Sequence, residues 1–185
     1  METMHAHEKI INTFDYNGTS VDLVEWYDSI WCGKVGYAAD NIDEPDVEKI
    51  MNDFMATFEP KIVPNKREEN WDVCMSLNYL SSEHPNGVFF GFRVETDKQP
   101  DCFDIIKVPS STYMRVCICE ETFKALNVEP WMGGIPPYEW ICEKIAPEFG
   151  YQNGSDTLPI FEYYGHNAED NHIEICYLYV PVKAK

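Results

Sequence analysis

The amino-acid pattern predicts the same order of elements twice along this chain: a strand, a helix and two further strands. Alternating apolar residues mark the strands, and apolar spacings of three and four residues mark the helices. The first set is expected at 21–31, 45–58, 71–80 and 88–95, and the second at 103–120, 136–149, 158–164 and 172–182. This order favours the α+β class, with two helices packed on one antiparallel sheet.

Both halves are expected to share one domain. The chain has 185 residues, a length that corresponds to a single domain, and no linker or low-complexity stretch divides it. We therefore expect one domain at 21–183, with halves at about 21–96 and 102–183, after an N-terminal extension at 1–20. Within that extension, His5 and His7 are given no functional weight.

The charge balance restricts the partners. The chain has 14 basic and 32 acidic residues, which gives a formal charge of −18 at pH 7. Such a chain repels phosphate backbones and anionic lipid surfaces, so neither nucleic acid nor a membrane is expected as a partner. A small aromatic or cationic ligand is compatible with this charge. No signal peptide or membrane-spanning stretch is recognised, so we expect a cytoplasmic protein, either monomeric or a homodimer.

The seven cysteines are scattered through apolar segments, as is typical of reduced thiols in a protein core. Cys117 and Cys119 share one face of a predicted strand, but no further cysteine or histidine nearby completes a tetrahedral site. Nucleotide-binding and metalloprotease motifs are not found either. We therefore expect neither a metal nor a cofactor.

The last two predicted strands are apolar or aromatic on both faces, a pattern typical of central strands that are covered on both sides. Helices would cover one side, and a cleft lined with tyrosines is the candidate for the other. Glu162 and Glu174 interrupt these faces, although an unpaired buried carboxylate is costly. Each is therefore either a cleft carboxylate that attracts a cation or orients water, or a solvated residue near a strand end.

Aromatic rings provide the candidate ligand contacts, because ring walls bind flat or cationic molecules. Phe, Tyr and Trp together make up 14% of the chain. The alternative is a tyrosine-rich core whose hydroxyl groups reach the surface. The candidate ligand-binding residues are Trp31, Tyr113, Trp131, Tyr138, Trp140, Tyr164 and Tyr179.

Four segments carry a resemblance to a known family. They are 108–113, in which Pro109-Ser110-Ser111 interrupts a strand, 130–141, 158–164 and 177–183. In these segments the chain resembles the GyrI-like small-molecule-binding family, whose domain also serves as the effector-binding part of multidrug-responsive transcription activators. The resemblance implies a pseudo-symmetric pair of strand–helix–strand–strand units with a ligand cleft between them. The chain resembles a stand-alone member, because it has no helices that would bind DNA.

The resemblance also implies roles for single residues. In drug-binding relatives, a glutamate four residues before the proline of the last strand contacts cationic ligands, and here this position is Tyr177. Glu162 and Tyr164 match the Glu-x-Tyr pattern of the family and are therefore expected in the cleft.

Three functions follow as hypotheses. The first is the binding of planar aromatic or xenobiotic compounds. The second, which some stand-alone relatives suggest, is hydrolysis of the cyclopropane ring of duocarmycin-type compounds. There a tyrosine such as Tyr177 would polarise the ligand carbonyl, and Glu162 or Glu174 would orient the attacking water. The third is a protein-binding module, such as one that binds a topoisomerase.

Overall fold

The computed structural model describes residues 7–37, 63–68, 70–77, 87–126 and 137–185, and the single positions 49, 52 and 56. Its strands form one antiparallel sheet in the order β1-β2-β7-β10-β9-β4-β5-β3-β6, and β8 pairs with β10. The strands are β1 (Glu8–Tyr16), β2 (Thr19–Trp26), β3 (Ser29–Tyr37), β4 (Trp71–Ser76), β5 (Gly87–Val94), β6 (Asp104–Val108), β7 (Ser111–Cys117), β8 (Tyr151–Asn153), β9 (Ile160–His166) and β10 (Ile173–Ala184). The predicted antiparallel sheet is thus confirmed.

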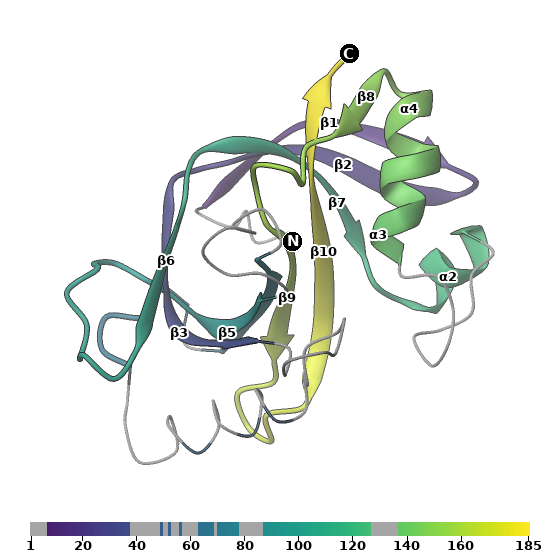
Figure 1. Ribbon diagram of the computed structural model, residues 1–185. Helices are drawn as coiled ribbons and strands as arrows, with labels where there is room; N and C mark the ends of the chain where they lie inside the picture. Colours follow the sequence, from purple (N-terminus) through teal and green to yellow (C-terminus); the bar gives the residue numbers. More distant parts are fainter. Residues whose placement is uncertain are drawn as a thin grey trace.

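The sheet curves strongly, and helices cover its outer face beside β7 and β10 (Figure 1). They are α2 (Glu120–Leu126) and one continuous helix made of α3 (Pro137–Trp140), the π-helical turn η2 (Ile141–Ile145) and α4 (Ala146–Glu148). Ile141 and Ile145 pack against Met114 of β7 and Leu178 of β10. The helix predicted at 136–149 is confirmed over its described part.

The other predicted helix, at 45–58, lies almost entirely outside the described residues. Its three described positions, Lys49, Asn52 and Ala56, are helical and exposed. Their spacing of three and four residues puts them on one side of a helix, as the amphipathic pattern predicts.

The inner, concave face of the sheet holds a cluster of aromatic side chains that we call the inner aromatic cluster. Each member has an exposed fraction of 0%, and Phe161 stacks on Tyr179 with ring centroids 4.6 Å apart. Members on β9 and β10 share this face because side chains alternate along a strand. The cluster consists of Trp26, Trp31, Phe89, Tyr113, Phe161, Tyr163 and Tyr179.

The strand predicted at 21–31 is two strands, so this prediction was wrong. The chain turns at Tyr27 and Asp28, and β2 pairs with β7 whereas β3 pairs with β5 and β6. Long-range hydrogen bonds hold the turn: Tyr27 N donates to His7 O at 3.0 Å, and Ser110 N donates to Asp28 Oδ1 at 2.7 Å. The strand predicted at 103–120 is interrupted at Pro109 and Ser110, as expected, because β6 ends at Val108 and β7 begins at Ser111.

Residues 8–16, within the segment placed ahead of the domain, form β1 and pair with β2 at one edge of the sheet. His7 and Glu8 at the start of this strand have exposed fractions of 1% and 5%. The start of β1 is therefore part of the packed interior, whereas Ile10 and Ile11 further along are exposed.

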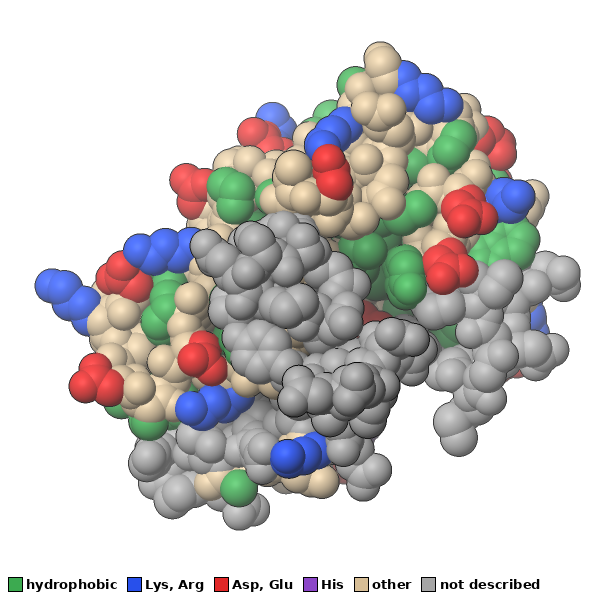
Figure 2. All heavy atoms as spheres, in the orientation of Figure 1, with side chains coloured by type: hydrophobic (Ala, Val, Ile, Leu, Met, Phe, Trp, Pro, Cys, Tyr) green, Lys and Arg blue, Asp and Glu red, His purple; other side chains and the backbone are tan. Residues whose placement is uncertain are grey.

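On the face drawn in Figure 2, Lys and Arg side chains of the described residues lie singly and do not gather in one patch. Two lysines pair with aspartates, Lys107 with Asp97 at 2.6 Å and Lys183 with Asp156 at 2.7 Å. The described part of this face therefore offers no continuous basic surface for phosphate groups. Among the described residues, no helix is long and apolar enough to cross a membrane.

The close approach of β3 and β5 predicts a large cost for a methyl group at Gly33. A Cβ there would lie 1.9 Å from the Phe90 carbonyl oxygen, which the sheet holds in place. We expect Gly33→Ala to lower the free energy of unfolding by about 3 kcal/mol or more. At Gly18, where φ is +86° and no atom lies within 4 Å, Gly18→Ala should cost only about 1 kcal/mol. Urea unfolding of the two variants measures both values, and equal losses would contradict the steric account.

Candidate ligand-binding site

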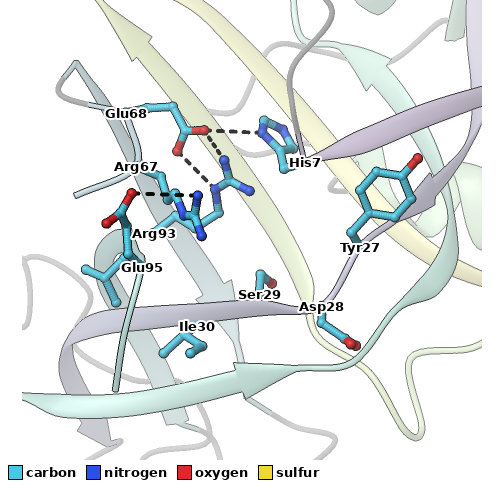
Figure 3. A pocket seen from close by; sticks show the side chains of 10 residues that line it. His7, Tyr27, Asp28, Ser29, Ile30, Arg67, Glu68, Arg93 and Glu95 are labelled. Carbon is cyan, nitrogen blue, oxygen red and sulfur yellow. Dashed lines mark hydrogen bonds and ion pairs between the residues drawn. The ribbon is translucent and has the colours of Figure 1, made fainter. Parts of the chain in front are cut away.

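A pocket of about 350 Å³ opens where the corner between β2 and β3 meets the end of β5 (Figure 3). Ligand pockets in proteins commonly have volumes of about 300–1,000 Å³. Its wall mixes basic, acidic and apolar side chains. The lining residues are His7, Tyr27, Asp28, Ser29, Ile30, Arg67, Glu68, Arg93, Val94 and Glu95.

Backbone contacts to the end of β5 hold the segment that carries Arg67 and Glu68. Arg67 N donates to Arg93 O at 2.9 Å, and Glu95 N donates to Asn65 O at 2.9 Å. These bonds fix Glu68 beside the inner face, although the segment itself is not one of the named strands.

Glu68 joins the pocket to the inner aromatic cluster. Its carboxylate accepts hydrogen bonds from Arg93 Nε at 3.0 Å and from the Tyr163 hydroxyl at 3.0 Å, and Arg93 Nη2 also donates to it. His7 Nδ1 lies 3.5 Å from Glu68 Oε1. Burial alone would raise the pKa of Glu68, but the hydrogen bonds and charges of His7 and Arg93 outweigh it and lower the pKa to about 2. Glu68 is therefore a stable anion beside aromatic rings.

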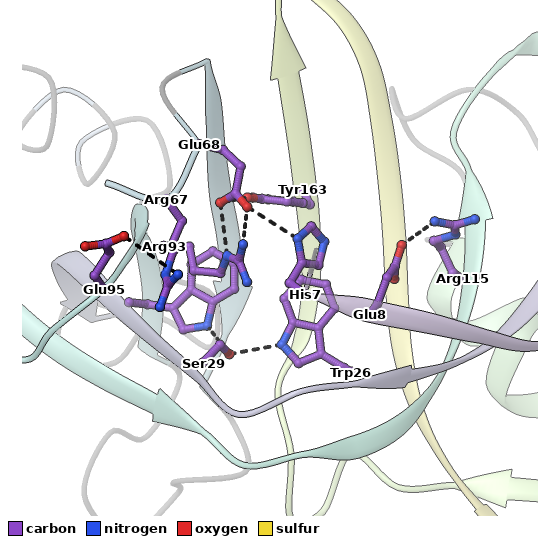
Figure 4. Close-up of polar contacts among 11 residues, drawn as sticks. His7, Glu8, Trp26, Ser29, Arg67, Glu68, Arg93, Glu95, Arg115 and Tyr163 are labelled. Carbon is purple, nitrogen blue, oxygen red and sulfur yellow. Dashed lines mark hydrogen bonds and ion pairs between the residues drawn. The ribbon is translucent and has the colours of Figure 1, made fainter. Parts of the chain in front are cut away.

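Two indole rings lie behind the pocket, and Ser29 connects them (Figure 4). The Ser29 hydroxyl oxygen accepts from Trp26 Nε1 at 3.0 Å and from Trp31 Nε1 at 2.9 Å. His7 covers Trp26, with ring centroids 4.4 Å apart, and meets Tyr163 edge-on at 5.5 Å. Ser29 and His7 both line the pocket and contact the buried rings, so they connect the pocket to the inner aromatic cluster.

A second buried ionic network lies along the inner face. Arg115 of β7 pairs with Glu8 and with Asp22, the latter at 2.6 Å. Burial would lower the pKa of Arg115, but the two carboxylates raise it, so the guanidinium stays charged. Its Cζ lies 4.7 Å from the centre of the Tyr177 ring, a cation–π contact.

Tyr177 and Trp71 form the partly exposed rim of the inner aromatic cluster. Their rings are parallel within 3°, with centroids 6.4 Å apart, and Trp71 also lies 4.7 Å from Tyr163. Gly165 lies beneath this rim, and a Cβ there would come within 2.8 Å of Trp71 Cζ2 and of Ile175 Cγ2. The absence of a side chain at Gly165 lets the indole lie over the strand.

The structure brings Trp31, Tyr113 and Tyr179 together, as members of the inner aromatic cluster. All three have an exposed fraction of 0% and pack against protein rings, including the edge-on contact of Tyr113 with Tyr179 at 6.3 Å. Burial raises the pKa of the Tyr179 hydroxyl well above its ordinary value. Tyr179 is therefore protonated at neutral pH.

Glu162 and Tyr164 lie on the opposite face of β9 from Phe161 and Tyr163, because side chains alternate along the strand. The Tyr164 hydroxyl donates to the Glu162 carboxylate, and burial raises the pKa of Glu162. Glu174 is exposed and accepts a hydrogen bond from Asn167 Nδ2 at 2.7 Å. Neither glutamate therefore joins Tyr177 on the inner face.

Two further predicted residues lie on the outer helix. Tyr138 and Trp140 are half-buried on α3, and Tyr138 lines a second pocket of about 350 Å³ with Cys142 and Ile160. Trp131 lies outside the described residues. Among the described residues, no group of three or more acidic, histidine or cysteine side chains is arranged to hold a metal ion.

Sequence reasoning missed the polar residues of the inner face: His7, Glu8, Glu68, Arg93 and Arg115. The sequence gives no reason to assign His7 a function, yet His7 is buried against Trp26. A usable signal was present in two strands. Arg93 follows Phe89 and Gly91 on the inward-facing positions of its strand, and Arg115 follows Tyr113 in the same way. A buried arginine requires a carboxylate partner, so both positions indicate buried ion pairs.

The depressed pKa of Glu68 predicts a pH-dependent contribution to stability. That contribution is fully present above the ordinary pKa of 4.5 and is lost as the pH falls towards about 2. Allowing for solvent screening, Glu68→Gln should lower the free energy of unfolding at neutral pH by roughly 2 kcal/mol. The difference from the natural chain should shrink between pH 4.5 and 2, because Glu68 is then protonated. Urea unfolding across this pH range measures it.

Glu95→Gln is the matched control, since Glu95 lines the same pocket but is 57% exposed beside Arg67. Its effect on unfolding should stay below about 0.5 kcal/mol. A loss in Glu68→Gln that does not change with pH would show that the carboxylate charge is not the cause.

The sequence matches no protein-family model, and a search of curated proteins gives no match. Solved structures are similar in fold. The C-terminal domain of EcmrR is 13% identical, the match covers 89% of this chain and 98% of that chain, and the TM-score is 0.51. An integron cassette protein of Vibrio cholerae is 16% identical, the match covers 88% of this chain and 95% of that chain, and the TM-score is 0.48. SAV2435, in its structure bound to tetraphenylphosphonium, is 14% identical. That match covers 88% of this chain and 93% of that chain, and the TM-score is 0.46. The chain shares the fold of the EcmrR domain, and we draw nothing from the two lower scores.

Proposed function

We propose that this chain is a GyrI-like domain that binds planar aromatic small molecules on the inner face of its sheet. The motifs at 130–141, 158–164 and 177–183 support the family, and so does the fold shared with the EcmrR C-terminal domain. The observation that carries the ligand class is the inner aromatic cluster with its half-exposed rim of Trp71 and Tyr177.

The strand order supports the duplicated unit of this family. From β2 to β6 the order is β2-β7-β10-β9-β4-β5-β3-β6. Each strand of one half has a counterpart in the other half: β2 corresponds to β6, β3 to β7, β4 to β9 and β5 to β10. When every strand is replaced by its counterpart, the same order is obtained, read from the other end of the sheet. The exchange leaves the pair β4–β9 in the middle, where Val73 faces Tyr163 and Trp71 faces Gly165. A ligand cleft between the two halves would lie over this pair.

The rim is chemically suited to a flat ligand. Aromatic pairs prefer offset-stacked or edge-on geometry. The rings of Trp71 and Tyr177 are parallel and half-exposed, and a flat ring system would stack on the part of them that Arg115, which lies over the Tyr177 ring, leaves open. Trp31, Tyr113 and Tyr179 would form the rigid floor behind them. The carboxylate of Glu68, which accepts a hydrogen bond from Tyr163 and is paired with Arg93, is compatible with ligands that carry positive charge.

We do not extend the proposal to hydrolysis. A reaction with Tyr177 as the polarising group and Glu162 as the base needs both side chains on one ligand, but they lie on opposite faces of the sheet. Glu174, the alternative base, bonds to Asn167 in an exposed turn. No contact among the described residues favours a protein-binding module over a ligand site.

Calorimetric titration tests the proposal with 9-aminoacridine and ethidium as planar cations and 1-aminoanthracene as a neutral planar compound. We expect at least one of them to bind with a Kd of about 100 μM or lower, which corresponds to a binding free energy of roughly 5.5 kcal/mol or more. Trp71→Ala and Tyr177→Ala should each weaken binding by about tenfold, because a ring stacked on an aromatic side chain contributes roughly 1–3 kcal/mol.

Trp140→Ala is the matched control, since Trp140 is also half-buried but lies on the outer helix. It should change the Kd by less than about twofold. If none of the three compounds binds the natural chain, or if the Trp140 variant loses as much affinity as the Trp71 variant, the inner face is not the site.

A further inference from the structure

His7 occupies an unusual place for a residue ahead of an edge strand. Its backbone oxygen accepts a hydrogen bond from Tyr27 N at 3.0 Å, and the next residue, Glu8, pairs with Trp26 in the register of β1 and β2. This start of the sheet ladder turns the imidazole inward, and its exposed fraction is 1%. A side chain from the beginning of the chain is thereby brought against the inner aromatic cluster.

The imidazole is surrounded by groups that can also contact a flat ligand. Trp26 lies against it, tilted by 48° with ring centroids 4.4 Å apart, and Tyr163 meets it edge-on at 5.5 Å. On its polar side, Nδ1 lies 3.5 Å from the anionic Glu68 carboxylate. Aromatic rings together with a carboxylate form a typical site for a flat, nitrogen-bearing cation.

His7 also lies between the pocket and the rings. It lines the pocket of about 350 Å³, whereas Trp26 and Tyr163, which it touches, do not line that pocket. Withdrawal of the imidazole would therefore extend the pocket to the side chains of Trp26 and Tyr163. Figure 4 draws these three residues together. His7 comes before Glu8, the first residue of β1 that pairs with β2. Movement of His7 would therefore break the hydrogen bond from Tyr27 N to His7 O and leave the paired residues of β1 and β2 in place.

From these contacts we infer that His7 is an internal competitor, whose imidazole fills the subsite for a flat nitrogen-bearing ring formed by Trp26, Tyr163 and Glu68. A planar cationic ligand that reaches this subsite must displace it. The competition rests on the proposed function, because it needs an external ligand. The imidazole subsite does not depend on that function and can be tested alone.

Rescue by free imidazole tests the subsite. His7→Ala should lower the melting temperature, and imidazole at tens of millimolar should restore part of the loss, because it fills the vacated space beside Glu68. His172→Ala is the control, since His172 is exposed, and neither it nor the natural chain should respond to imidazole. The absence of any imidazole-dependent shift specific to His7→Ala would overturn the subsite.

Competition is tested by titrating 9-aminoacridine into the natural chain, His7→Ala and His172→Ala. Removal of the competitor should tighten binding by about fivefold or more in His7→Ala alone, because a ligand no longer has to expel the imidazole. Equal or weaker binding by His7→Ala, with the natural chain still binding, would overturn the competition and leave the proposed function intact. If no planar compound binds any of the three proteins, the proposed function fails, whereas imidazole rescue still decides the subsite.

A measurement on the natural chain keeps the inference testable if His7→Ala does not fold. In proton NMR spectra, the His7 ring signals should be displaced by the ring currents of Trp26 and Tyr163. Addition of a saturating planar cation should move these signals towards ordinary values as the imidazole leaves. Unchanged His7 signals in the saturated complex would overturn the displacement.

Discussion

The alternation of side chains along β9 and β10 determines what this sheet can bind. One set of positions, with Phe161 and Tyr163 on β9 and Tyr179 on β10, builds the inner aromatic cluster. The other set carries Glu162 and Leu178, which face the outer side. A slip of one residue in either strand would exchange these faces. The separation of rings and glutamate is therefore set by the backbone and does not depend on side-chain rotation.

Hydrogen bonds to three of its side chains help to bury the inner aromatic cluster. The two indole N–H groups share the Ser29 hydroxyl, and the Tyr163 hydroxyl is held by Glu68. Each unsatisfied polar group would cost about 1–3 kcal/mol in this interior. The polar residues around the pocket thus stabilise the rings, and they also place an anion beside an aromatic surface.

Much of the architecture could be predicted from the chain. Period-two alternation located the later strands, and the spacing of Ile141 and Ile145 located the outer helix. The turn at Tyr27 and Asp28 could not be predicted, because bonds from His7 and Ser110, which are distant in sequence, hold it. Glu162 was expected in the cleft because it matches the Glu-x-Tyr pattern of the family. Such a pattern identifies a position in the sequence, but the register of β9 decides which face of the sheet the side chain lies on. His7 and Glu68 escaped prediction because their environment is made by three separate segments of the chain.

We propose that a planar ligand lies on the inner face of the sheet, against the rim of the aromatic cluster. A crystal structure of the protein with bound 9-aminoacridine would locate the ligand. Acridine carbons should then lie in van der Waals contact with the rings of Trp71 and Tyr177. A ligand seated on the outer face beside Glu162 and Tyr164, with the rim rings untouched, would contradict it.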